Sequence, residues 1–295
     1  MATVQPIATD AAMEVLREGG NAVDAAVCAA LTLSVVDNHN SGIGGGCLIL
    51  VRSPDGELIA IDGREMAPAA ASRDMFLVDG KADTALSQVG PLAVATPGAL
   101  AAYALLLDEA GSKPLSRLLQ PGLEAARDGF ALDANYARRL ASNAKNLRRF
   151  PGSRAQLLDA DGEAHPQGYR LKQPDLAATY AGIAKHGPDW FYRGPFAEKV
   201  GEWMATNGGI LTANDFAAYE PKKREPVVSK YRGRTIVGFP PPSSGGVHVA
   251  QMLGMLERFD LATMLREDRR DAVHVITEAM KLAFADRAHW LGDAD

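Results

Sequence analysis

The order of apolar and polar residues predicts a chain that is richer in helices than in strands. Apolar residues recur on one helical face over Thr9–Leu16, and the pair Gly19–Gly20 would end that helix. A second helix is predicted over Asn21–Val36; its asparagine can cap the first turn, in which Asp24 is favoured by the helix dipole. Few polar residues interrupt this second helix, which is typical of the interior of a large protein.

A glycine-rich segment follows, and then a β-hairpin. Residues Asp37–Gly46 fit no regular structure, because the consecutive glycines at the end allow positive φ angles and close approach of backbones. An apolar strand is predicted from Cys47, a turn at Ser53–Gly56, and a returning strand that ends at Asp62. The hairpin leads directly to Arg64.

The rest of the chain is predicted to be mainly helical, with one more hairpin over Val227–Phe239 and a loop over Pro240–Gly246. Thr212 and Asp215 have the spacing of a capping box. Helical periodicity marks these further segments: Gly98–Asp108, Leu115–Arg127, Pro174–Lys185, Ala197–Asn207, Val247–Phe259 and Ala272–Trp290. No repeat, linker or domain boundary is visible, so residues 1–295 are predicted to form a single region.

The composition is that of a globular protein, with 47% hydrophobic and 23% charged residues. The net charge of -5 argues against nucleic-acid binding, which usually needs a basic face. The sequence contains no apolar stretch of about 18 residues, so no membrane-spanning helix is predicted. The first residues show no basic region followed by an apolar core, so no signal peptide is visible.

The cysteines and histidines give no sign of a metal site. Cys28 lies in the apolar helix and Cys47 opens the apolar strand, so both are expected to be buried thiols. The histidines are scattered without zinc-ligand spacing, and each is expected to be a surface or hydrogen-bonded residue: His39, His165, His186, His248, His274 and His289. We therefore predict no metal and no cofactor.

The glycine-rich segment and Arg64 are the candidates for chemistry. The run Ser41–Gly46 resembles a phosphate cradle, but a strand follows and no helix begins there, which favours a tight turn under packed backbone. Arg64 is either a solvated or ion-paired residue, with Asp62 and Glu65 near in sequence, or a planar fork that binds a carboxylate in a bidentate manner. Local chemistry alone favours the solvated or ion-paired interpretation.

The serines of the proline-rich loop are weaker candidates. Ser243 and Ser244 could act as nucleophiles, and His248 is close in sequence, but no spacing of a known nucleophile arrangement is present. A structural loop is the favoured interpretation.

In combination, several blocks resemble the γ-glutamyltranspeptidase family. They occur in the family's order and cover essentially the whole chain: GGNAVDAA (Gly19–Ala26), SGIGGG (Ser41–Gly46), DGREMAP (Asp62–Pro68), ATPGALAAY (Ala95–Tyr103), FPPPSSGG (Phe239–Gly246) and ADRAHWLGDAD (Ala285–Asp295). Each block alone is weak, but together they are specific. The chain therefore resembles the N-terminal, large-subunit portion of that family.

The resemblance implies an α+β fold, the four-layer αββα sandwich of N-terminal-nucleophile hydrolases, incomplete without the small subunit. Members are precursors that cleave themselves, and the threonine that then begins the small subunit attacks the γ-glutamyl carbonyl with its own α-amino group as base. Water, an amino acid or a peptide resolves the acyl-enzyme. No Thr-Thr-His-like block occurs here, so the resemblance implies no catalytic residue in this chain, which is predicted to be inactive alone.

The arginine of the family's REMAP block maps onto Arg64, which the resemblance implies binds the α-carboxylate of the γ-glutamyl group. The implied partners are a γ-glutamyl compound such as glutathione and the small catalytic subunit of the same precursor. Members are usually exported, which implies a periplasmic or extracellular location, although no signal peptide is visible.

Two alternatives stay open. The first is a β-lactam acylase of the same fold that cleaves the glutaryl side chain of a cephalosporin. That substrate also has a distal carboxylate, so Arg64 does not distinguish it. The second is a non-catalytic chain that folds or binds a ligand without turnover.

Overall fold

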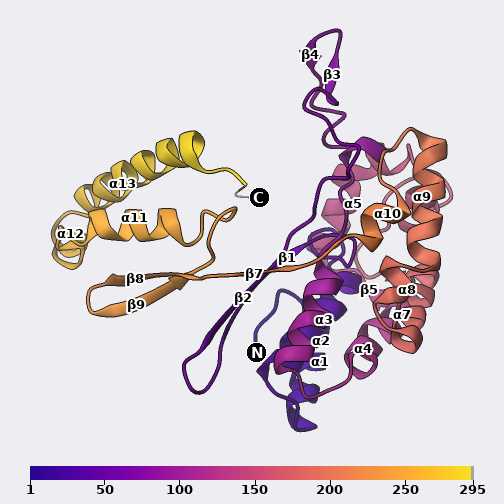
Figure 1. Ribbon diagram of the computed structural model, residues 1–295, viewed down its shortest axis with the longest axis horizontal. Coiled ribbons are helices and arrows are strands. Elements are labelled where there is room, and N and C mark those ends of the chain that lie inside the picture. Colours follow the sequence, from indigo (N-terminus) through magenta and orange to yellow (C-terminus); the bar gives the residue numbers. More distant parts are fainter. Residues whose placement is uncertain (294–295) are drawn as a thin grey trace. The chain divides into compact units, whose positions relative to one another are not determined.

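The computed structural model of the chain describes residues 1–293 (Figure 1). Ala294 and Asp295, which end the last of the family-like blocks, lie outside the described residues. The chain divides into two compact units: residues 1–47 with 63–221, and residues 48–62 with those from 222 onward. That both units belong to a single large-subunit region stays a prediction.

The first unit is mainly helical. Its helices are α1 (Pro6–Arg17), α2 (Ala22–Val36), the short 3-10 helix η1 (Pro91–Ala93), α3 (Ala99–Ala110), α4 (Leu115–Asp128), α5 (Ala134–Leu147), α6 (Pro151–Leu157), α7 (Pro174–His186), α8 (Asp189–Tyr192), α9 (Pro195–Asn207) and α10 (Ala213–Ala217). Its strands form two small pairs, β3 (Leu77–Val78) with β4 (Lys81–Ala82), and β5 (Phe130–Ala131) with β6 (Arg170–Leu171).

Helix α2 forms the core of the first unit and packs against both α1 and α4. Its buried residues occupy all sides of the helix, as the apolar pattern predicted. Asn21 and Asp24 form the capping box at its start: the Asn21 side chain accepts from the Asp24 N–H, and the Asp24 carboxylate accepts from the Asn21 N–H at 2.8 Å. Asp24 also accepts the N–H groups of Ser112 and Lys113, so the same carboxylate holds the segment that leads into α4.

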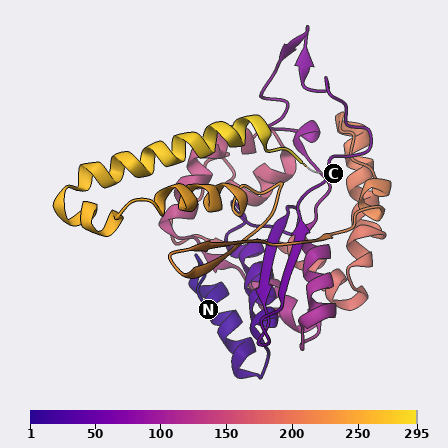
Figure 2. The same cartoon turned by 60° about the vertical axis from the view of Figure 1, so that its left-hand side comes forward.

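The second unit contains a three-stranded sheet of order β1-β2-β7, a hairpin and three described helices. The sheet strands are β1 (Cys47–Arg52), β2 (Leu58–Gly63) and β7 (Lys222–Arg224); β8 (Val227–Tyr231) and β9 (Arg234–Gly238) form the hairpin; the helices are α11 (Val247–Leu256), α12 (Leu261–Glu267) and α13 (Arg269–Trp290). Helices α11 and α13 lie side by side in both views (Figures 1 and 2).

The mixture of helices and sheet confirms the α+β class. Both predicted hairpins are present, and each helix predicted by periodicity is found with its ends shifted by a few residues. Helices α5, α6, α8 and α12, the short helix η1 and strands β3–β7 were missed. The sequence Lys-Lys-Arg of β7 has no strand pattern of its own and becomes a strand by antiparallel pairing with β2, where Asp62 faces Lys222. Within residues 1–293, no helix combines the length and the apolar character that crossing a membrane requires.

Candidate functional site

Arg64 is the first residue after β2, as the hairpin pattern predicted. It is exposed, whereas the preceding Gly63 is buried. The phenol of Tyr219 donates a hydrogen bond of 2.8 Å to the backbone carbonyl oxygen of Arg64. The backbone at this position is therefore tied to the segment after α10, while the residue itself stays at the surface.

Glycines let other backbone segments approach Arg64 closely. A Cβ atom on Gly46 would lie 2.8 Å from the Cα atom of Arg64 and 2.7 Å from the carbonyl oxygen of Gly63. A Cβ atom on Gly98 would lie 2.4 Å from the same carbonyl oxygen. Atoms cannot pack at these distances, so any side chain at Gly46 or Gly98 would force the segments apart. The structure thus supports the interpretation of the glycine run as a turn under packed backbone.

Three of the blocks that suggested a family meet at this point. The carbonyl oxygen of Gly45, in the glycine run, accepts the N–H groups of Gly98 and Ala99 at the start of α3, each at 3.0 Å. Met66 and Thr96 exchange backbone hydrogen bonds of 3.1 and 2.8 Å. The SGIGGG, DGREMAP and ATPGALAAY blocks therefore pack their backbones together around Arg64.

Tyr219 also contacts this packed backbone, and the sequence patterns did not predict it. It follows Arg64 by 155 positions and lies just after α10, where no local pattern marks it. Only 6% of Tyr219 is exposed, and its ring stacks on Tyr192 with centroids 5.9 Å apart. The Tyr192 hydroxyl in turn donates to the Pro97 carbonyl at 3.0 Å and accepts from the Ala101 N–H at 3.1 Å. Tyr192 thus fastens the segment from Pro97 to Ala101, and the Tyr219 hydroxyl lies against Gly98 of the same segment.

A polar cavity of about 570 Å³ lies along the glycine run, within the first unit. Besides Ser41, Gly42 and the glycines 44–46, its lining includes Asn38, His39, Asn40, Cys47, Glu65 and Tyr103. Burial raises the pKa of the Tyr103 phenol, and the neighbouring Cys47 thiol acts in the same direction. The volume and the polar lining suit a small polar molecule.

His39, at the edge of this cavity, is held by Asp37 and Asn135. Its Nε2 atom lies 3.3 Å from the Asp37 carboxylate and 3.3 Å from the Asn135 amide nitrogen. Its Nδ1 atom is buried without a hydrogen-bond partner among the described residues, and the same holds for Nδ1 of His248. The expectation of a surface or hydrogen-bonded histidine holds for His39, through Nε2, and was wrong for the buried His248.

In the second unit, Asp62 forms an ion pair with Arg224 of β7. The Arg224 guanidinium contacts one carboxylate oxygen of Asp62 at 2.9 Å through Nη2 and at 3.1 Å through Nε. Both side chains are largely buried, with 7% and 16% exposed. One of the two acidic neighbours proposed for Arg64 is thus a partner of an arginine that lies 162 positions further along the chain.

The cysteines agree only in part with the expectation of two buried thiols. Cys28 is buried, and burial raises the pKa of its thiol to about 11. Cys47 is half-buried, because it opens β1 at the wall of the polar cavity. Within the described part of the chain, no group of three or more His, Cys, Asp or Glu residues is arranged to hold a metal ion.

The proline-rich loop is held together by its own hydrogen bonds. The Ser243 hydroxyl oxygen accepts the Gly245 N–H at 3.1 Å, and the Gly246 N–H donates to the Phe239 carbonyl at 2.9 Å. These contacts fit the structural interpretation of the loop better than a nucleophile site.

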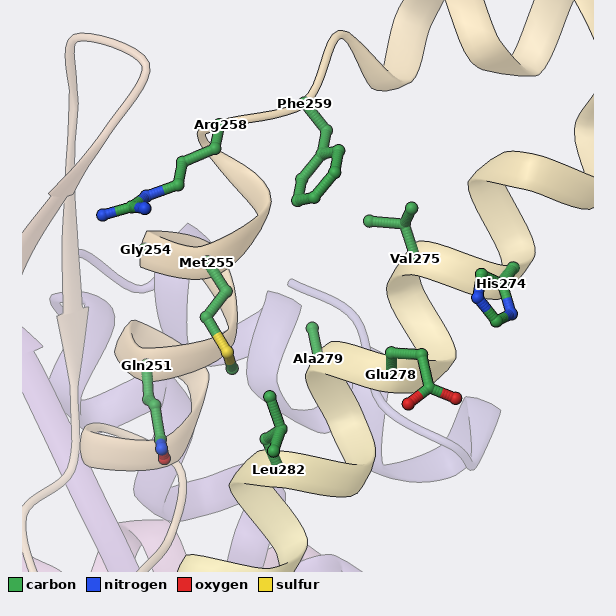
Figure 3. A pocket seen from close by; sticks show the side chains of 10 residues that line it. All are labelled: Gln251, Gly254, Met255, Arg258, Phe259, His274, Val275, Glu278, Ala279 and Leu282. Carbon is green, nitrogen blue, oxygen red and sulfur yellow. The ribbon is translucent and has the colours of Figure 1, made fainter.

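A second cavity, of about 700 Å³, lies between α11 and α13 of the second unit (Figure 3). Figure 3 shows Met255 of α11 and Leu282 of α13 directed into the space between the two helices, with Phe259 and Val275 at one end. Polar residues such as Gln251 and Glu278 contribute to the lining beside these apolar groups. The groove is mainly apolar, although Arg258, His274 and Glu278 also line it.

Comparison with known proteins gives a consistent result. The family model described as gamma-glutamyltranspeptidase matches residues 8–295. The chain is 41% identical to the glutathione hydrolase proenzyme of Escherichia coli strain K12, over 100% of this chain and 51% of that protein. It is also 41% identical to the acylase ACY 1 proenzyme of Pseudomonas sp. strain SE83, over 97% of this chain and 52% of that protein. The chain thus spans about half the length of the curated relatives it matches.

Among solved structures, the gamma-glutamyltranspeptidase of Helicobacter pylori superposes with a TM-score of 0.97 at 37% identity, covering 100% of this chain and 84% of that one. The fold is therefore that of the N-terminal-nucleophile hydrolases, and this chain forms part of that fold. More narrowly, the chain belongs to the γ-glutamyltranspeptidase family.

Proposed function

We propose that this chain is the large-subunit portion of a γ-glutamyltransferase that also acts as a glutathione hydrolase. In this proposal the γ-glutamyl group of glutathione or a related compound is transferred to water, an amino acid or a peptide through a threonine acyl-enzyme. The threonine belongs to the small catalytic subunit of the same precursor. The word proenzyme in the relatives' names, and their roughly double length, support a precursor of two parts.

The observation that carries the proposal is the position of Arg64. It is an exposed arginine at the end of a strand, and its backbone is enclosed by glycines and tied by Tyr219. A guanidinium on a fixed backbone can present two parallel N–H donors to a carboxylate. We assign Arg64 the role of binding the α-carboxylate of the γ-glutamyl donor.

The test uses the protein at proenzyme length, after self-cleavage. Replacing Arg64 by lysine keeps the charge and removes the planar fork, so KM for γ-glutamyl-p-nitroanilide should rise by a factor that corresponds to about 1.5–3 kcal/mol. The matched control is Arg52→Lys, at the exposed end of β1 in the same hairpin, which should leave KM within about twofold. Unchanged kinetics of the Arg64 variant would refute the assignment.

One relative is an acylase, so that activity is the second candidate. A glutaryl cephalosporin offered to the same preparation distinguishes the two enzymes, because only an acylase should release its side chain efficiently. Residues 1–295 alone should hydrolyse neither substrate. If the full-length protein also hydrolyses neither, a non-catalytic role is left.

A further inference from the structure

We propose that Tyr219 is a positioning residue of this site, which acts on donor binding through Arg64 by fixing its backbone carbonyl. The inference rests on the proposed function, since it presupposes that Arg64 binds the donor carboxylate. It adds a residue that the family-like blocks around Arg64 do not contain.

The contact between the two residues is direct. The Tyr219 hydroxyl donates to the Arg64 carbonyl oxygen at 2.8 Å. The hydroxyl oxygen occupies space that only a glycine at position 98 leaves open, because a Cβ atom there would lie 2.0 Å from it. The phenol therefore reaches the Arg64 carbonyl through the space that the absent side chain of Gly98 leaves open.

Tyr219 is itself rigid, which a positioning role requires. Its N–H donates to the Phe216 carbonyl at 3.1 Å at the end of α10, and its ring lies nearly parallel to that of Tyr192, at 15°. Phe216 is almost fully buried. The aromatic cluster thus fixes the position of the Tyr219 hydroxyl, and movement of the Arg64 carbonyl would break the hydrogen bond.

The reason that such a contact matters is geometric. A bidentate arginine–carboxylate pair needs its partners held within about 0.5 Å of the productive arrangement. Arg64 lies beyond the last residue of β2, so strand pairing no longer holds its backbone. The Tyr219 hydrogen bond and the close glycine contacts hold this part of the backbone instead.

The first measurement is the kinetics of Tyr219→Phe in the self-cleaved, proenzyme-length protein. This change removes one oxygen atom and keeps the ring. We expect KM for γ-glutamyl-p-nitroanilide to rise about 3- to 10-fold while kcat changes less than twofold. The matched control is Tyr180→Phe, which removes a buried tyrosine hydroxyl that also donates to a backbone carbonyl, that of Leu31, at 2.8 Å. It should lower the unfolding temperature without raising KM.

The second measurement combines the variant with Arg64→Lys. If Tyr219 acts through Arg64, the double variant should have nearly the KM of Arg64→Lys alone, because the lysine no longer needs the fixed backbone. Additive effects would overturn the proposal, and so would an unchanged KM in Tyr219→Phe. A Tyr219→Phe protein that fails to fold would overturn it too, since the hydroxyl would then serve folding rather than donor binding.

These outcomes separate the two proposals. If the wild-type protein does not turn over the γ-glutamyl donor, or if Arg64→Lys leaves KM unchanged, the proposed function fails. If Arg64→Lys raises KM and Tyr219→Phe does not, only the role of Tyr219 fails.

Discussion

Gly46 packs so closely on Arg64 that a Cβ atom at position 46 would lie 2.8 Å from the Arg64 Cα atom. The same Cβ atom would lie 2.8 Å from the Glu65 carboxylate. The glycine run therefore determines where the backbone of Arg64 lies, although it contributes no side chain to the chemistry.

Replacing Gly46 by alanine should push the strand end that bears Arg64 away from the glycine run. The free energy of unfolding should fall by about 1–3 kcal/mol, as for other overpacked sites. Denaturant unfolding of the purified chain measures this change.

Gly44→Ala is the matched control for Gly46→Ala. It lies in the same run, is exposed, and has nothing within 4 Å of its Cβ position. It should change the free energy of unfolding by less than about 0.5 kcal/mol. Equal losses of unfolding free energy in the two variants would show that loop stiffness, rather than contact with Arg64, explains the need for glycine at position 46.

Asp24 should make the stability of the chain depend on pH in the acid range. Burial raises the pKa of Asp24, but hydrogen bonds from the Ser112 side chain and from the backbone of Asn21, Ser112 and Lys113 outweigh it and leave the pKa below its ordinary value. A carboxyl whose pKa is lower in the folded state stabilises that state above the unfolded-state pKa of about 3.9. The stabilisation is lost as the pH falls through the folded-state pKa.

The corresponding variant is Asp24→Asn. At pH 7 it should lower the free energy of unfolding by about 1–3 kcal/mol, because an amide cannot accept all of these hydrogen bonds. The difference from the wild type should shrink as the pH falls below about 4. Asp10→Asn, at an exposed position of α1, is the control and should show no such convergence. A difference that stays constant down to pH 3 would contradict the role given to Asp24.

The ion pair of Asp62 and Arg224 predicts a large effect in the second unit. Arg224→Met leaves a carboxylate that is only 7% exposed without its arginine, which should cost about 3–5 kcal/mol of unfolding free energy. Adding Asp62→Asn should restore part of the loss, because the buried charge is then gone.

The exposed pair of Arg270 and Asp268 is the control for that experiment. Its contact is shorter, at 2.6 Å, but the arginine side chain is 90% exposed. Arg270→Met should therefore cost less than about 1 kcal/mol. If Arg224→Met and Arg270→Met lowered the free energy of unfolding equally, burial would not be the reason for the strength of the pair of Asp62 and Arg224.

Local patterns predicted most of the elements because each has its own signal. The apolar run after Asn21, the turn at Ser53–Gly56 and the glycines after α1 depend only on neighbouring residues. Helix α5 was missed because few of its residues face the core: Tyr136, Leu140 and Ala144 are buried among many polar positions. Its cap at Asp133 was the available signal, since the side chain accepts the Tyr136 N–H.

The order of residues was enough to place Arg64 directly after a strand and to make the glycine run a turn, because backbone propensities and short turns act over a few positions. It could not show that Asp62 pairs with Arg224, or that Tyr219 reaches the carbonyl of Arg64, since these partners lie 162 and 155 positions away. Such contacts exist only after the intervening helices have packed, because burial brings distant segments together and leaves glycine as the one residue that fits between them. The sequence alone identified Arg64 as a candidate, whereas the contacts of Gly46, Gly98 and Tyr219 that hold its backbone were decided by the tertiary structure.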